Sequence, residues 1–303
     1  MNEYRRMILE GMQNRYPEQK FYIGTVKGNN GCNYVGICAE LGEDNHCTPI
    51  IPCEKYERDL QDNKCSLEYV LEDIARQFEE RKSVRVRDFS DYSQIKGMIF
   101  MRMVNYELNK EYLKTVPYRR WLDLAVTYRM ELLVGQGSLG VIPITNARLA
   151  VWNMTEEDLF QDVFANLFKE HSVRIRSLEQ AYIEDFGEDD PYMEFMVHVP
   201  EEEEQYYIAD TEYPWNGAAC VLDKSAFREF AKKKDKDLYI IPASVNRVIV
   251  VVKGEDVSVE RLSDILEASN IFIMPKAEVL SYHIYQYCRE LDEITDVAVP
   301  VIL

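Results

Sequence analysis

The chain has 303 residues and a formal net charge of −18, with 35 Lys and Arg against 53 Asp and Glu. A hydrophobic content of 47% excludes a disordered chain, and the length allows one large domain or two ordinary ones. So large an acidic excess repels phosphate groups, so we expect neither direct nucleic-acid binding nor docking on an anionic membrane.

The sequence predicts a cytoplasmic protein. The first ten residues carry charges without an apolar stretch behind them, so no export signal is expected. The longest purely aliphatic stretch, Val248–Val252, is far too short to cross a bilayer. Seven cysteines, an odd number, are typical of reduced thiols.

The N-terminal segment, residues 1–85, predicts a helix, a hairpin and a second helix. The first helix is expected over Asn2–Tyr16, and the hairpin strands over Phe21–Lys27 and Tyr34–Glu40. A short strand is expected at Thr48–Ile51. Ser66 caps the second helix, whose apolar side chains recur at helical spacing. They are Leu67, Val70, Leu71, Ile74, Ala75 and Phe78.

The middle segment, residues 86–205, is expected to combine strands with two helices. The strands are Met98–Val104, Trp121–Leu133 and Val141–Thr145, and the short helix is Asn109–Thr115. A longer helix opens at Thr155, with Asp158 placed for a capping box. The glycine-rich loop 135–140 leads from strand to strand, which indicates a hairpin turn and not a phosphate loop.

The C-terminal segment, residues 206–303, repeats this mixture. Strands are expected at Ala218–Leu222, Leu238–Ile241, Val248–Val252 and Tyr282–Cys288, and helices at Ser225–Lys233 and Ser258–Ala268. Neighbouring strands joined by short turns favour antiparallel pairing. The predicted fold class is therefore α+β, with mostly antiparallel mixed sheets and amphipathic helices packed on them.

Negative charge is concentrated between Ile183 and Glu204. This segment holds ten acidic residues and no Lys or Arg, and it ends in four successive glutamates. Because like charges repel one another, we expect an exposed loop or strand edge there.

Five motifs follow one another between Asp91 and Glu290. They are Leu122–Arg129 (LDLAVTYR), Ile144–Asn146 (ITN), Asn216–Leu222 (NGAACVL), Leu238–Val248 (LYIIPASVNRV) and Glu278–Tyr285 (EVLSYHIY). In this order they resemble an uncharacterised bacterial family, the domain-of-unknown-function family 5688. The resemblance implies a bacterial, cytoplasmic protein without a known activity. Where that family favours Ser-Ser-Ile-His-Glu after the proline, this chain has residues 243–247 as Ala-Ser-Val-Asn-Arg, so any role of that histidine is absent or altered.

A cysteine-rich stretch in the N-terminal segment is a candidate zinc site. Zinc sites use close pairs such as C-x₂-C, because two ligands from one tight turn can face one ion. Successive cysteines here lie six, nine, six and twelve residues apart and form no such pair, so we expect no metal and no cofactor. The candidate ligands are Cys32, Cys38, His46, Cys47, Cys53 and Cys65.

Three residues of the C-terminal segment could line a catalytic cleft: Cys220, Ser244 and Asn246. No helix N-terminus is predicted to lower the pKa of the Cys220 thiol, and Pro242-Ala243-Ser244 lacks the glycines of a nucleophile elbow. A buried cysteine and a serine that closes a turn are the simpler interpretations.

An aromatic cluster follows the four glutamates and could form a contact surface for a protein partner. Its members are Tyr206, Tyr207, Tyr213, Trp215 and Asn216. The simpler interpretation is that the rings belong to the core of a sheet.

The leading hypothesis is therefore a non-catalytic interaction or regulatory protein that binds another protein. The alternatives are an enzyme of unrecognised type with its cleft in the C-terminal half, and an acidic protein that imitates nucleic-acid phosphates.

Overall fold

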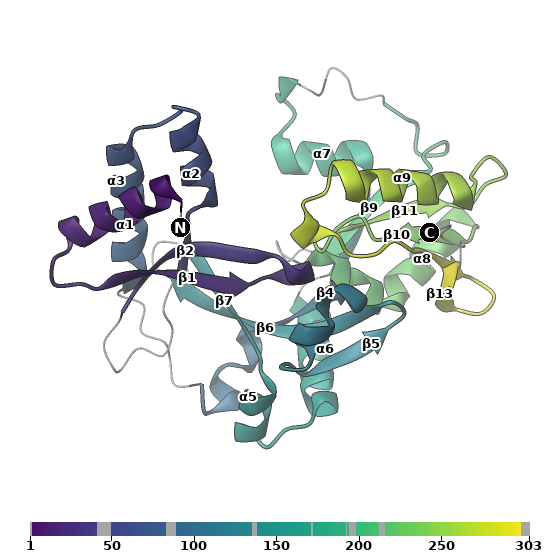
Figure 1. Cartoon of the computed structure of the whole chain (residues 1–303). Helices are drawn as coiled ribbons and strands as arrows, with labels where there is room; N and C mark the ends of the chain where they lie inside the picture. The colour runs from purple at the N-terminus through teal and green to yellow at the C-terminus, as the bar shows by residue number, and fades with distance from the viewer. Residues whose placement is uncertain are drawn as a thin grey trace. The chain divides into compact units, whose positions relative to one another are not determined.

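A computed structural model describes residues 2–40, 50–82, 89–134, 138–170, 172–191, 193, 198–211 and 216–297 (Figure 1). The chain forms two compact units. Unit 1 comprises Met1–Met98 and Met130–Ile142, and unit 2 comprises Ile99–Arg129 and Pro143–Leu303. The sequence predicted three segments, residues 1–85, 86–205 and 206–303, and this division stays a prediction.

Unit 1 packs three helices on one face of a small antiparallel sheet. Strands β1, β2 and β3 pair in that order, and Phe21 and Ile37 point with Ile51 into the core. Ile8 of α1 and Ile74 of α3 are fully buried against them. The bounds are α1 (Glu3–Arg15), β1 (Phe21–Lys27), β2 (Asn33–Ala39), β3 (Ile50–Pro52), α2 (Glu54–Gln61) and α3 (Leu67–Lys82).

The predicted elements of unit 1 are confirmed where the structure describes them, and α2 was missed. The β1–β2 hairpin turns at Asn30 and Gly31, which have φ angles of 55° and 68° and so need residues that tolerate positive φ. Ser66 caps α3 by accepting a hydrogen bond from the backbone of Tyr69. Helix α2 carries only a few apolar residues in a charged run. The sequence therefore has no periodic apolar stripe there that would predict a helix.

The chain then forms a second sheet, in which β6 pairs with β4, β5 and β7. The strand expected over Trp121–Leu133 is present as β6, but it begins only at Leu124, because Leu122 and Asp123 form the turn of a tight hairpin with β5, which was missed. Thr155 and Asp158 do form the expected cap of α6. The bounds are β4 (Ile99–Asn105), α4 (Lys110–Leu113), β5 (Tyr118–Trp121), β6 (Leu124–Val134), β7 (Ser138–Pro143), α5 (Asn146–Val151) and α6 (Glu156–Glu170).

The largest sheet, in unit 2, has six strands in the order β13-β12-β10-β11-β9-β8, each paired antiparallel with its neighbour. Leu262 and Leu266 of α9 pack on one face of it, and the ring of Phe230 on α8 packs against Tyr207 of β9 on the other. The bounds are β8 (Val173–Ser177), α7 (Leu178–Phe186), β9 (Tyr206–Thr211), α8 (Lys224–Lys234), β10 (Leu238–Ile241), β11 (Val248–Val252), α9 (Val259–Phe272), β12 (Ile284–Cys288) and β13 (Glu293–Val297).

The strand expected at Ala218–Leu222 is wrong, because this segment is the 3₁₀ helix η6 (Gly217–Leu222). Asn216 enters it with a φ of 61°, and a Cβ atom on Gly217 would lie 2.4 Å from the carbonyl oxygen of Asn246. The small residues allow this close packing, whereas a short apolar run by itself does not distinguish a strand from a buried turn.

The α+β fold class is confirmed, since antiparallel sheets are covered by helices. Among the described residues, no helix has both the length and the apolar character that a bilayer span requires.

Candidate functional site

Three residues that the sequence singled out meet at the turn formed by residues 244–247. The backbone N–H of Asn216 donates to Oδ1 of Asn246 over 3.1 Å, and the backbone N–H of Asn246 donates to Oγ of Ser244 over 3.1 Å. Asn216, Ser244 and Asn246 therefore lie together, and the amide and hydroxyl groups close the turn against the start of η6.

Neither proposed nucleophile is prepared for chemistry in this arrangement. Cys220 is fully buried, and burial, followed by the nearby Asp210 and Asp223 carboxylates, raises its pKa well above the usual value. Such a thiol stays protonated and unreactive. Ser244 is only 6% exposed, and its hydroxyl oxygen accepts the turn hydrogen bond. The simpler interpretations of both residues fit this geometry, and a catalytic cleft here stays a prediction.

The predicted contact surface is described for three of its five residues. Tyr206 is 40% exposed and Asn216 is half-buried, whereas Tyr207 is 5% exposed. Tyr213 and Trp215 lie outside the described residues. One surface built from all five residues therefore stays a prediction.

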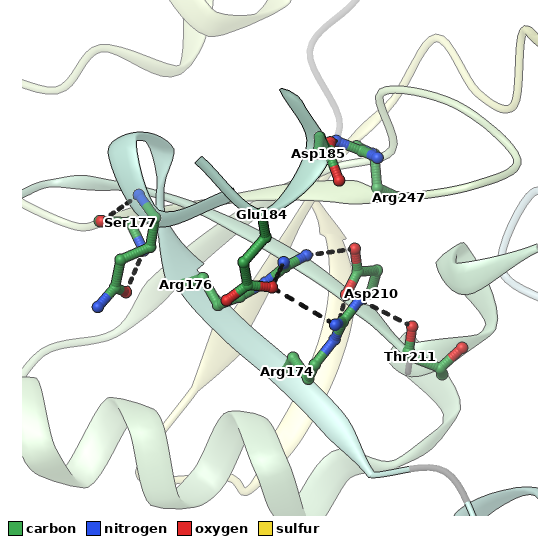
Figure 2. A network of polar contacts seen from close by, with 9 residues as sticks. Arg174, Arg176, Ser177, Glu184, Asp185, Asp210, Thr211 and Arg247 are labelled. Atoms are coloured by element: carbon green, nitrogen blue, oxygen red, sulfur yellow. Dashed lines mark hydrogen bonds and ion pairs between the residues drawn. The ribbon is translucent and has the colours of Figure 1, made fainter. Parts of the chain in front are cut away.

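A buried network of ion pairs lies beside η6 and was missed from the sequence (Figure 2). Arg174 donates to Oδ1 of Asp210 through Nε and Nη2, over 3.1 and 3.0 Å. Nη2 of Arg176 donates to the other oxygen of Asp210 over 2.6 Å. Arg176 and Asp210 are 8% and 6% exposed, so both charges are almost wholly removed from water.

Helix α7 contributes a second carboxylate to this network. Figure 2 shows Glu184 reaching from α7 to the two arginines of β8, with Nη1 of Arg174 3.5 Å from its Oε2. One residue further on, Asp185 accepts from Nη1 of Arg247 over 2.8 Å. The network therefore joins β8, β9, α7 and the turn that holds Ser244 and Asn246.

The network corrects the expectation for the start of the acidic segment only: Glu184 and Asp185 lie on α7 and are paired with arginines, whereas residues 201–203 form an exposed turn, as expected. A sequence signal was present. Val173–Ser177 alternates apolar and basic residues with a period of two, which is typical of a strand. The partner of those arginines could not be read from a chain with 53 acidic residues.

A cavity of about 390 Å³ lies on the opposite side of β8 and β9 from this network. It is lined by the first turn of α7, by residues 198–204, by Tyr207 and by α8. Nδ1 of His198 lies 2.8 Å from Glu179, and Nζ of Lys233 lies 2.6 Å from Glu201. The cavity thus has an acidic rim, part of which is formed by the four successive glutamates, residues 201–204.

An exposed apolar patch lies at the end of α9. Ile271, Phe272 and Ile273 are 60%, 82% and 78% exposed, and Ile265 is 54% exposed one to two turns earlier. We call these four residues the α9 patch. Three consecutive large apolar side chains facing water are unusual in a monomeric protein.

The cysteine-rich stretch shows no metal centre in the part of the chain that the structure describes, where no three His, Cys, Asp or Glu side chains are grouped to hold an ion. Cys38 and Cys53 are buried, and burial raises the pKa of Cys53 to about 11. His46 and Cys47 lie outside the described residues.

The model of the family of unknown function DUF5688 matches residues 1–289 of the chain. The chain belongs to this family. Membership confirms the resemblance found from Asp91 to Glu290 and extends it through unit 1. No curated protein and no solved structure matches the chain.

Proposed function

We propose that this DUF5688 protein is a non-catalytic interaction or regulatory protein of the bacterial cytoplasm, and that its partner is another protein. The observation that carries the proposal is the α9 patch. Its side chains lie at the end of a helix whose other face, through Leu262 and Leu266, is anchored in the core of unit 2. Because this helix is already ordered, binding through the patch does not include the entropy cost of ordering the helix.

The size of the patch suits a partner of moderate affinity. Burying a large aliphatic or aromatic side chain contributes about 1.5–3 kcal/mol relative to leaving it in water. Three such side chains supply several kcal/mol, although part of that gain offsets the entropy lost on association. Asp264 and Glu267, exposed on the same helix, give the patch a charged border that favours a partner with basic residues.

The enzyme alternative receives less support from the residues that suggested it. Cys220 and Ser244 are both buried, and the cavity of unit 2 lies beside Tyr207 and not beside them. The alternative that the acids imitate nucleic acid is also weakened. Glu184, Asp185 and Glu201 are neutralised by basic side chains of the same chain.

A matched pair of variants tests the proposal. Ile271→Ser, Phe272→Ser and Ile273→Ser are combined in one protein, and Val151→Ser with Leu291→Ser in the control, because Val151 and Leu291 are isolated side chains of 61% and 64% exposure. The unaltered protein is expected to co-isolate a protein partner from its native cell extract, and the triple variant to bind that purified partner at least about 100-fold more weakly.

The control should retain affinity within about twofold, because scattered surface apolar residues contribute little. Equal binding of the partner by all three proteins would show that the α9 patch is not the binding site. Concentration-dependent dimerisation that the triple variant abolishes would show that the patch pairs two copies of this chain, and it would overturn the proposal of a different partner.

A further inference from the structure

The cavity beside Tyr207 has an aromatic floor. The ring of Tyr207 is 5% exposed and meets the ring of Phe230 edge-on, with centroids 4.8 Å apart and planes at 71°. Ile175 of β8 completes the apolar base. A volume of about 390 Å³ is at the lower end of the range for ligand pockets, which suits one long side chain better than a large ligand.

Three carboxylates surround this floor. Glu179, Glu201 and Glu204 line the cavity, against Lys233 and the imidazole of His198. The negative charge of these carboxylates affects the Tyr207 hydroxyl. Burial first, and then the Glu204 and Glu201 carboxylates, raise the pKa of Tyr207 to about 12.

The chain already places ammonium groups at this site. Nζ of Lys234 lies 4.9 Å from the centroid of the Tyr207 ring and donates to the carbonyl oxygen of Glu201 over 2.8 Å. Nζ of Lys233 contacts the Glu201 carboxylate. The ring and the acidic rim are thus arranged to hold a cation by charge and by its attraction to an aromatic face.

Glu204 is placed to receive a further cation. One of its carboxylate oxygens accepts from the backbone N–H of Tyr206 over 3.1 Å, and no basic side chain is paired with it among the residues that the structure describes. That hydrogen bond fixes the carboxylate at the rim of the cavity without neutralising it.

We propose that this cavity binds the cationic side chain of a lysine or arginine presented by a protein segment. The apolar stem of such a side chain would lie against Ile175 and Phe230, and its charged end would meet the carboxylate of Glu204, beside the Glu201 carboxylate that Lys233 already contacts. This site lies on the α8 face of the sheet and the α9 patch on the other, so the inference does not depend on the proposed function.

The test uses the full chain labelled with ¹⁵N and four capped pentapeptides, in which lysine, arginine, norleucine or glutamate stands between pairs of glycines. Backbone amide shifts are followed as each peptide is added. The lysine or arginine peptide is expected to saturate shifts around Tyr207 with a Kd of the order of 1 mM, as a single buried side chain would give. The norleucine and glutamate peptides should bind at least about tenfold more weakly.

Two double variants separate the cavity from general acidity. Glu201→Gln with Glu204→Gln removes two charges at the rim and should weaken the lysine peptide at least about tenfold. Glu202→Gln with Glu203→Gln removes the same charge from exposed neighbours outside the cavity lining and should leave the affinity within about twofold.

Four results would overturn the inference. Equal losses in both double variants would mean diffuse attraction to the acidic run. Equal binding of the norleucine peptide would mean an apolar pocket. A lack of saturation by either basic peptide would mean no such site. Free spermidine is added as a fifth ligand, and tighter binding of spermidine than of both basic peptides would assign the cavity to a small polyamine instead of a protein segment.

Discussion

Asp210 is the residue on which the buried network of unit 2 depends. It accepts hydrogen bonds from Arg174 and Arg176, and its side chain is 8% exposed. Asp210→Asn keeps the size of the side chain and removes its charge. Arg176, with a side chain only 9% exposed, is then left with Glu184 as its remaining charged partner, and that carboxylate is 50% exposed.

The expected loss follows from this burial. Breaking a buried pair by removing one partner costs about 3–5 kcal/mol, because the remaining charge stays desolvated. Arg174 is 34% exposed and can regain water, so the lower end of that range, about 3 kcal/mol, is expected. Glu184→Gln is the matched control. It removes one charge from the same network at an exposed position and should cost at most about 1 kcal/mol.

Urea unfolding followed by tryptophan fluorescence measures both variants. All three tryptophans (Trp121, Trp152 and Trp215) belong to unit 2, so the signal reports on that unit alone. With a denaturant slope of about 2 kcal/mol per molar, Asp210→Asn should lower the midpoint by about 1.5 M. A double-mutant cycle with Arg176→Gln should give a coupling of at least about 1 kcal/mol. A loss for Asp210→Asn no larger than that for Glu184→Gln would refute the reasoning.

Three further predictions concern stability. Burial raises the pKa of Cys53 from 9.0 to about 11. The protonated thiol therefore contributes its full share to the free energy of unfolding below pH 9, and this contribution is lost as the pH rises toward 11. The loss should be about 1–3 kcal/mol by circular dichroism in urea, and Cys53→Ala should flatten this pH dependence; an unchanged slope would exclude Cys53 as its source. Asp235 ends α8 with a φ of 54° and adds negative charge at a helix C-terminus, and its exposed ion pair with Arg289 contributes little, so Asp235→Gly should stabilise unit 2 by about 0.5 kcal/mol, and a loss would contradict this account of the cap. Tyr285 donates to Asp123 from a fully buried position, so Tyr285→Phe should cost about 1–2 kcal/mol, whereas Tyr282→Phe, at a residue 42% exposed, should cost under about 0.5 kcal/mol; equal costs would mean that the Asp123 contact contributes nothing.

The local elements of the chain could be predicted because their signals are local. The stripe of α3 from Leu67 to Phe78, the Ser66 cap and the β1–β2 hairpin each lie within a short window of sequence. The α+β class followed from the same windows. Strand β8 and helix α7 were missed although local signals exist for both: the alternation of Val173–Ser177, and the capping box of Ser177 and Gln180 at the start of α7.

The functional geometry could not be predicted because it depends on pairs far apart in sequence. Arg174 meets Asp210 across the β8–β9 pairing, and Asn216 meets Asn246 at the start of η6. With acids throughout the chain, no spacing identifies which carboxylate an arginine will meet. The helix expected over Ser258–Ala268 stopped short of Ile271, Phe272 and Ile273, and the exposure of these side chains follows only from the way Leu262 and Leu266 orient the longer α9.

The most direct test of a protein partner is photo-crosslinking in the native cell. A photoreactive phenylalanine analogue replaces Phe272, and in a separate protein it replaces Val151, which has a similarly exposed apolar side chain outside the α9 patch. The account predicts that irradiation yields one discrete adduct with a different protein from position 272 and none from position 151. No adduct from position 272, or the same adducts from both positions, would contradict the claim that the α9 patch binds a partner.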